Sequence, residues 1–181
     1  MPVRLHLGCG ERFLPGFIHV DARKFDHVDH VSAIDSLTMF ADDSVDLIYH
    51  CALLEHVGRW DTVRVLSEWN RVLKPGGLLR SSVPNFEAIV TAYRKFNDVS
   101  KLLGMLYGGQ NYGENLHYTM FDRRYYAELL AQAGFENMRD YDWREFLPQG
   151  YDDFSRAYLP HMDFDNGIQM MLNVDANKRS G

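Results

Sequence analysis

Two glycines and a carboxylate near the start of the chain have the types and spacing of a ligand site. The apolar run Val3–Leu7 enters the turn Gly8-Cys9-Gly10, and a second apolar run ends at Asp21. Runs of this kind predict buried strands. In an open α/β sheet the ligand lies beyond the carboxyl ends of the strands, where glycines let N–H groups approach it and a carboxylate can bind both ribose hydroxyls. We therefore expect an adenosine-type ligand at Gly8, Cys9, Gly10 and Asp21.

The same stretch does not fit the dinucleotide-binding fingerprint. That fingerprint requires a third glycine, where Phe13 stands, and an acidic residue about 20 positions further on, whereas Asp21 comes much sooner. The link between the two strands is also shorter than a normal parallel crossover, so we expect no full helix in it. An ordinary tight turn between core strands is the alternative interpretation of the motif.

Polar and sulfur-containing residues also follow two other predicted strands. The first of these strands, at residues 31–34, is weakly marked, whereas the second, at residues 45–49, has the β-branched and aromatic content of a buried strand. The carboxyl ends of neighbouring parallel strands border the same ligand site. The further candidates for cofactor contacts are therefore Asp35 or Ser36, near the adenine, and His50 and Cys51.

Histidines and cysteines raise the question of a metal site. The chain has eight histidines, and His50, Cys51 and His56 are close in sequence, but no Cys-x-x-Cys or His-Glu-x-x-His spacing occurs. We therefore expect no bound metal. The two cysteines, Cys9 and Cys51, both follow apolar strands, and we expect reduced thiols rather than a disulfide.

The remaining pattern alternates strands with helices. Asp61 is a candidate N-cap for a helix that ends before Lys74–Gly77, a strand follows at residues 78–83, and Pro84-Asn85 leads into another helix. This alternation argues for a doubly wound, mostly parallel α/β sheet. Further helices are expected at residues 98–107 and after Asp122, and further strands at Asn137–Trp143 and Ile168–Val174, with a frayed end at Ala176–Gly181.

Composition indicates one globular domain over residues 1–181. The chain is 46% hydrophobic and 24% charged, and its formal net charge is −6. A negative balance argues against a broad surface for nucleic acid or anionic membrane. We find neither a signal peptide nor an apolar stretch of roughly eighteen residues, so we expect a cytoplasmic protein without membrane insertion.

A polar, glycine-containing segment lies between two predicted helices, where no strand is expected. Residues Gly108–Tyr118 include Gln110, Asn111, Tyr112 and His117, a mixture suited to stacking on a polar ring and hydrogen-bonding it. We expect residues 97–121 to form a helix and a lid on the substrate side of the pocket.

Several separate stretches together resemble the class I S-adenosylmethionine-dependent methyltransferases, in order and spacing, as far as Pro84. They are Leu7-Gly8-Cys9-Gly10, the strand ending at Asp21, Asp42–Tyr49, Leu54-Glu55-His56 and Glu68–Gly77. Three more resemble a compact bacterial group of predicted methyltransferases that is often associated with cell-surface glycan genes. These are Leu14–Phe17, Gly108-Gly109-Gln110, and His117 followed by Phe121-Asp122.

The resemblance implies a Rossmann-like, seven-stranded, mostly parallel sheet with an antiparallel last strand. It implies S-adenosylmethionine as cofactor, S-adenosylhomocysteine as product, and a small-molecule or glycan acceptor. Its topology brings Cys9 and Cys51 to the same cofactor edge. Two features depart from the family: His6 stands where many members have an acidic residue, and the first crossover is short. Without a helix there, fewer backbone dipoles would hold the methionine end of the cofactor.

Methyl transfer depends chiefly on aligning an acceptor lone pair with the methyl carbon and the sulfur. A hydroxyl or phenol acceptor would also gain from a general base with a pKa near the working pH, which favours histidine. His117 is the leading candidate, and the alternative is a loop histidine that only hydrogen-bonds the backbone. We interpret Glu55 and His56 as structural support for the helix after the fourth strand, and a catalytic role for them is the alternative.

Two other functions stay open. One is a noncatalytic cofactor-binding or partner-binding module of the same fold, which the short first crossover and the lack of an obvious base favour. The other is a nicotinamide-dependent oxidoreductase, against which Phe13 counts.

Overall fold

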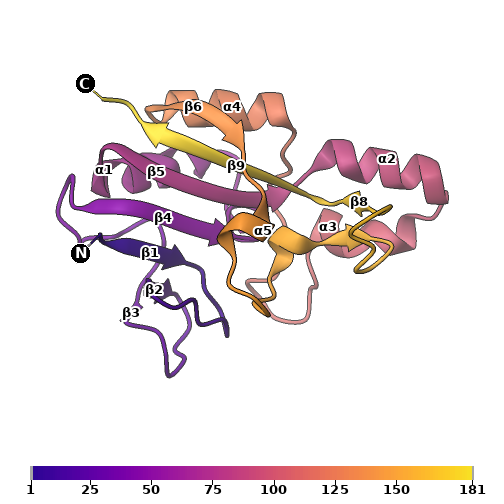
Figure 1. Ribbon diagram of the computed structural model, residues 1–181, viewed down its shortest axis with the longest axis horizontal. Helices are drawn as coiled ribbons and strands as arrows, with labels where there is room; N and C mark the ends of the chain where they lie inside the picture. Colours follow the sequence, from indigo (N-terminus) through magenta and orange to yellow (C-terminus); the bar gives the residue numbers. More distant parts are fainter. Residues whose placement is uncertain (1, 181) are drawn as a thin grey trace.

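A seven-stranded sheet forms the centre of the molecule, of which the computed structural model describes residues 2–180 (Figure 1). Its strands run in the order β3 (His30–Val31), β2 (Ile18–Asp21), β1 (Arg4–Leu7), β4 (Val45–Cys51), β5 (Leu73–Pro84), β9 (Met171–Lys178) and β6 (Phe135–Asp140). β9 is antiparallel to β5 and β6, and the other paired strands are parallel. The sequence prediction of a Rossmann-like, mostly parallel seven-stranded sheet with an antiparallel last strand is confirmed. A separate ribbon pairs β7 (Tyr158–Leu159) with β8 (Ile168–Gln169).

Helices cover the two faces of the sheet unequally. α1 (Thr62–Val72) and α4 (Arg123–Gln132) lie on one face, and the short α5 (Trp143–Phe146) lies on the other (Figure 1). α2 (Phe86–Phe96), the 3₁₀ turn η2 (Val99–Leu102) and α3 (Leu103–Tyr107) lie beyond the end of the sheet toward which β1 and β4 run. The other 3₁₀ turns are η1 (Leu54–His56), which follows β4, and η3 (Phe154–Arg156).

Side-chain caps start several helical segments at the residues predicted for them. Asn85, Asp98 and Asp122 each accept a hydrogen bond from a backbone N–H in the first turn that follows. Such bonds satisfy donors that a helix start otherwise leaves without partners. Asp61 precedes α1 as expected, but its carboxylate makes no capping bond and binds Arg64 instead.

Alternating side chains of β4 pack against opposite faces of the sheet, as the pleat requires. His50 lies against Trp69 of α1, with 4.8 Å between ring centroids, and its Nε2 pairs with the Ser81 hydroxyl at 2.9 Å. Tyr49 packs on the other face against Phe146 of α5, also at 4.8 Å. Both β4 side chains are fully buried, so the centre of the sheet is covered on both sides.

Some strand limits differ from those expected. β3 is shorter than the predicted strand at residues 31–34, and β6 begins at Phe135 and ends at Asp140, so that Trp143 opens α5 instead of ending a strand. β5 begins at Leu73 instead of residue 78, because Leu73 already pairs with Val45 of β4. The register of this pairing shifts before Leu78 pairs with Leu47, and the strand includes Lys74–Gly77. The prediction that no helix links β1 to β2 is confirmed in the described part of the chain.

The C-terminal stretch is ordered beyond the predicted strand. β9 continues to Lys178, so the expectation of fraying from Ala176 is wrong for these residues. Ala176 is buried, and the Lys178 ammonium donates to the Leu73 carbonyl at 2.8 Å and contacts Asp43 at 2.6 Å. Pairing with both β5 and β6 explains why the strand persists. Gly181 lies outside the described residues.

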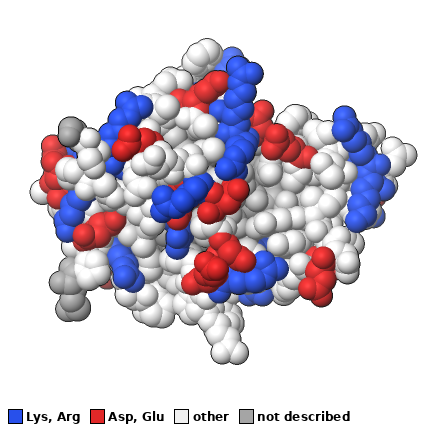
Figure 2. Space-filling model, turned by 45° about the horizontal axis from the view of Figure 1, so that its top comes forward, with Lys and Arg blue, Asp and Glu red and all other residues white. Residues whose placement is uncertain are grey.

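Charges of both signs are interspersed on the face that Figure 2 shows, and they form no broad patch of one sign there. Many exposed charges are paired, among them Arg64 with Asp35 and Arg123 with Asp140. That face therefore lacks a single-sign surface for electrostatic steering. Within residues 2–180, no helix has both the length and the apolar character that a membrane crossing requires.

We predict that His50 makes stability depend on pH. Burial lowers the pKa of His50 from 6.5 to about 3. Below pH 6.5 the unfolded chain therefore binds a proton at this residue that the folded chain excludes, and stability is lost as the pH falls toward 3. Between pH 7 and pH 5, His50 should account for a loss of about 2 kcal/mol in the free energy of unfolding.

Urea unfolding at the two pH values measures this loss. The variant His50→Gln should lose less stability than wild type over this interval, whereas the exposed control His161→Gln should follow wild type. An identical pH dependence for His50→Gln and wild type would refute the assignment.

Candidate functional site

Two adjoining cavities open at the carboxyl ends of β1 and β4. The first cavity, of about 370 Å³, reaches past the end of β2 to residues 33–35. The second cavity, of about 530 Å³, extends toward α3 and the loop at residues 109–117. Both volumes lie in the usual range for small-molecule sites. The residues that line both cavities are Gly8, Arg23, Ala52, His56 and Tyr112.

Asp21 shapes the glycine turn after β1. Gly8 and Gly10 have left-handed backbone, with φ of +61° and +55°. The Gly10 N–H donates to Asp21 Oδ2 at 2.7 Å, and the Arg23 N–H donates to Oδ1 at 2.8 Å. Asp21 is only 6% exposed, yet it lines the first cavity. The structure thus brings three predicted contacts together, and each carboxylate oxygen retains a lone pair for a ligand.

Of the two candidate residues that follow β3, one lies at the first cavity. Asp35 lines the wall beside Ile34 and pairs with Arg64 at 2.9 Å. The Trp69 indole donates to the Ile34 carbonyl at 2.8 Å and thereby holds this wall against α1. Ser36 does not line either cavity.

The candidates at the end of β4, together with Cys9 after β1, separate into two groups. Cys51 and Cys9 line the second cavity, whereas His50 lines neither cavity because its side chain points into the core. Both cysteines are free. Burial, followed by the nearby Asp21, raises the pKa of Cys9 to about 12, and burial also raises the pKa of Cys51. Protonated thiols of this kind are poor nucleophiles.

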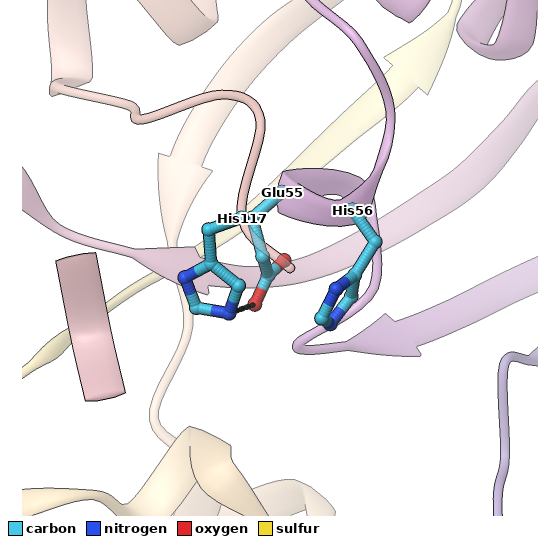
Figure 3. Close-up of side chains that lie close together, drawn as sticks. All are labelled: Glu55, His56 and His117. Carbon is cyan, nitrogen blue, oxygen red and sulfur yellow. Dashed lines mark ion pairs between the residues drawn. The ribbon is translucent and has the colours of Figure 1, made fainter. Parts of the chain in front are cut away.

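A carboxylate and two imidazoles converge at the wall of the second cavity (Figure 3). Glu55 and His56 come from η1, and His117 comes from the loop after α3. His117 Nε2 lies 3.9 Å from Glu55 Oε1, and the two imidazole centroids are 4.9 Å apart. The sequence interpretation placed His117 at the site and gave the other two a structural role, whereas the geometry brings all three to one point.

Backbone bonds hold this cluster in place. The His117 ring Nδ1 pairs with the Met105 carbonyl at 2.9 Å, and the His56 ring Nδ1 pairs with the Leu116 carbonyl at 3.0 Å. The Tyr118 N–H donates to the Glu55 carbonyl at 2.8 Å. The end of the predicted lid is therefore fixed to η1, and the expectation of a moving segment remains a prediction for its solvent-facing part, residues 109–114.

Burial sets the charge state of the cluster. Glu55 is completely buried, neither of its carboxylate oxygens has a hydrogen-bond partner among the described residues, and burial raises its pKa to about 8. Burial lowers the pKa of His117 and of His56, although the carbonyls at their Nδ1 atoms act in the opposite direction. With each Nδ1–H donated to a carbonyl, the neutral rings present a lone pair at Nε2.

Some residues of the site were not found from the sequence. Arg23 and Ala52 line both cavities, and the Arg23 guanidinium lies 4.9 Å from the centroid of the Tyr112 ring, which comes from the loop. A basic residue two positions after Asp21 was the available signal for Arg23. Nothing in the sequence indicated Ala52, because its side chain has no reactive or polar group and only the path of the backbone after β4 brings it to the cavities.

Comparisons with known proteins agree with this fold. A family model described as a methyltransferase domain matches residues 13–80. No curated protein sequence matches the chain. Solved structures of S-adenosylmethionine-dependent methyltransferases match almost all of it. The fold is that of the S-adenosylmethionine-dependent methyltransferases.

Three of these structures illustrate the match. One from Methanosarcina mazei is 20% identical, with a TM-score of 0.57 and coverage of 98% of this chain and 92% of the other. One from Archaeoglobus fulgidus is 14% identical, with a TM-score of 0.57 and coverage of 98% and 86%. The 1,6-didemethyltoxoflavin-N1-methyltransferase of Burkholderia thailandensis, solved with bound 1,6-didemethyltoxoflavin and S-adenosylhomocysteine, is 15% identical, with a TM-score of 0.56 and coverage of 98% and 72%.

We predict that Gly8 cannot carry a side chain without disturbing the cavity wall. A Cβ at Gly8 would lie 2.4 Å from Leu53 Cδ1, whereas a Cβ at Gly16 would meet nothing within 4 Å. Both glycines have positive φ, so Gly16→Ala is a matched control for backbone strain. Because the contacting atoms are the end of the flexible Leu53 side chain, which can rotate away, Gly8→Ala should cost about 0.5–1.5 kcal/mol more than Gly16→Ala in the free energy of unfolding, measured in urea. Equal losses would show that the contact with Leu53 is not tight.

Proposed function

We propose that this protein transfers a methyl group from S-adenosylmethionine to a small-molecule or glycan-type acceptor. The observation that carries the proposal is the pair of adjoining cavities, which meet at the glycine turn and at Ala52. A donor and an acceptor must bind side by side for a direct transfer, and two cavities with a shared wall suit this requirement. The match of residues 13–80 to a methyltransferase domain supports the same function.

In this proposal the first cavity holds the adenosine part of the donor. The Asp21 carboxylate accepts hydrogen bonds from the ribose hydroxyls, because it is buried, aimed into the cavity and already fixed by the Gly10 and Arg23 amides. The adenine lies against residues 33–35. The methionine part follows the turn at Gly8 and Gly10, so that the methyl group points into the second cavity.

The second cavity holds the acceptor. Its wall combines aromatic and polar side chains suited to a polar ring: Tyr112, Phe154, Asn111, Asn115 and Lys101. A lone pair of the acceptor attacks the methyl carbon, the carbon–sulfur bond breaks with its electron pair on sulfur, and S-adenosylhomocysteine leaves as product. His117 lines this cavity, and its Nε2, which lies 3.9 Å from Glu55 Oε1, keeps a lone pair that accepts the hydrogen bond and then the proton of an acceptor hydroxyl.

A noncatalytic module of the same fold is the second candidate function. One observation favours it: in the described part of the chain, no helix lies between the glycine turn after β1 and the start of β2. The methionine part of a donor would therefore meet fewer aligned backbone dipoles. Stoichiometric binding of S-adenosylhomocysteine with no transfer to any of a broad set of acceptors would favour this candidate.

We predict that Asp21→Asn weakens binding of S-adenosylhomocysteine by about 10- to 150-fold, because a hydrogen bond to a charged group contributes about 1.5–3 kcal/mol. Calorimetry measures the affinity. The exposed control Asp26→Asn, in the same loop, should bind like wild type. An unchanged affinity in a folded Asp21→Asn variant would remove the ribose role.

We predict that His117→Ala slows methyl transfer far more than it weakens donor binding, since the donor is held mainly at Gly8, Gly10 and Asp21. Single-turnover rates, donor affinity and melting temperature are measured on the same variant. If His117 only satisfies the Met105 carbonyl, the variant loses thermal stability while the transfer rate of the folded protein stays normal.

A further inference from the structure

The cluster at the wall of the second cavity contains a buried carboxylate that lacks partners. Glu55 has no exposed surface, and neither oxygen makes a hydrogen bond within the described part of the chain. The nearest basic group is His117, at 3.9 Å, and no lysine or arginine of residues 2–180 pairs with Glu55. Buried polar atoms are nearly always satisfied in folded proteins, so this carboxylate indicates a missing binding partner.

The two histidines beside it are oriented as metal ligands are. In each ring Nδ1–H donates to a backbone carbonyl, that of Leu116 for His56 and that of Met105 for His117. This bond fixes the tautomer and leaves Nε2 free, which is the usual arrangement around histidines that bind metals. The Leu116 carbonyl belongs to backbone that the bond between the Tyr118 N–H and the Glu55 carbonyl holds near η1. The Met105 carbonyl belongs to α3, and the His117 N–H donates to the carbonyl of Tyr107 at the end of the same helix, so the ligands are positioned before any ion arrives.

We propose that Glu55, His56 and His117 bind one divalent cation, Zn²⁺, whose open coordination position faces the second cavity. One ligand atom from each residue lies within 4.8 Å of the other two. Ligand atoms around tetrahedral zinc are about 3.3 Å apart, given bonds of about 2.05 Å. Binding the ion therefore requires the ligand atoms to move together by up to about 1.5 Å, through rotation of the side chains.

The donor set narrows the choice of ion and is compatible with zinc. Two imidazoles and one carboxylate form the ligand set of several catalytic zinc sites, which keep a further position open. Mg²⁺ and Ca²⁺ prefer oxygen ligands and do not match two imidazoles. Among divalent metals that accept nitrogen, zinc binds more tightly than iron or manganese. The sequence expectation of no metal rested on spacing within short motifs, and this cluster joins residues 62 positions apart in the chain.

The ion would activate the acceptor hydroxyl for methyl transfer, and this part of the inference rests on the proposed function. An acceptor alcohol or phenol binds the cation through its oxygen and loses its proton to water in the cavity, because the ion stabilises the oxyanion. The oxygen lone pair then attacks the methyl carbon of the donor, and the carbon–sulfur bond breaks with its electrons on sulfur. The oxidation state of the metal does not change. With the ion bound, His117 Nε2 is a ligand and does not accept the proton.

Zinc binding can be measured without any methyl donor or acceptor. Protein stripped with EDTA and then freed of chelator is titrated with Zn²⁺ in a calorimeter, and we expect one ion per chain. Glu55→Gln, His56→Asn and His117→Asn should each weaken binding by more than about 100-fold, because loss of even an outer hydrogen-bond partner commonly costs 10- to 100-fold. His27→Ala is the matched control, since His27 lies 3.8 Å from the Cys9 sulfur and forms the competing nearby pair of metal-binding groups.

Co²⁺ provides a spectroscopic readout of the same site. Wild type and His27→Ala should show visible absorption bands of low-symmetry cobalt coordinated by nitrogen and oxygen, and the three ligand variants should lose them. Melting curves establish that each variant is folded, and zinc should raise the melting temperature of wild type but not that of Glu55→Gln. Wild type that binds no Zn²⁺, or a folded Glu55→Gln variant with wild-type affinity, would overturn the proposal.

The outcomes also separate this proposal from the proposed function. Stoichiometric zinc binding through the three ligands supports the metal site even if no methyl transfer is found. Methyl transfer that persists at full rate in chelated, zinc-free wild type would support the proposed function and overturn the role of the ion.

Discussion

The hydrogen bond from the Gly10 N–H to the Asp21 carboxylate is the constraint on which the two cavities depend. It joins the turn after β1 to the end of β2, and the positive φ of Gly8 and Gly10 lets the backbone make that turn without a helix. The same carboxylate fixes the Arg23 amide, and the Arg23 guanidinium lies over the Tyr112 ring at the boundary of the cavities. The short connection between β1 and β2 therefore positions these residues without the help of a longer crossover.

The wall of the second cavity is built differently, from contacts between distant parts of the chain. η1 directly follows β4, and the Glu55 carbonyl accepts hydrogen bonds from the Tyr118 and Thr119 amides. The Thr119 hydroxyl donates to the Val57 carbonyl at 2.7 Å. These bonds keep His117 beside η1 while the solvent-facing part of the loop remains exposed. Backbone held by these bonds around a buried carboxylate without hydrogen-bond partners in residues 2–180 is an arrangement expected at a site that binds a ligand.

Features set by local sequence could be predicted. The turn at Gly8 and Gly10, the strand ending at Asp21, and the caps at Asn85 and Asp122 each depend on a few neighbouring residues, and they follow from backbone freedom and hydrogen-bonding capacity. The mostly parallel sheet followed from the alternation of elements, and the neighbouring positions of the first and fourth strands followed from the family resemblance. The antiparallel β9 was placed by the resemblance alone, because its apolar run does not reveal its direction.

Features set by side-chain direction or by long-range contacts could not be predicted. His50 and Cys51 both end β4, but the strand pleat sends only Cys51 to the cavity and turns His50 toward Trp69. Glu55 was interpreted from the sequence as structural support, because its meeting with His117 depends on how the loop after α3 returns to η1.

The most direct test of the account is calorimetry of wild-type protein with S-adenosylhomocysteine, followed by a search for transfer from S-adenosylmethionine to hydroxyl-bearing small molecules and glycans. The account predicts saturable binding of one S-adenosylhomocysteine per chain, no comparable binding of NADH, and transfer of the donor methyl group to at least one acceptor. A folded protein that binds neither S-adenosylmethionine nor S-adenosylhomocysteine at millimolar concentration would contradict it.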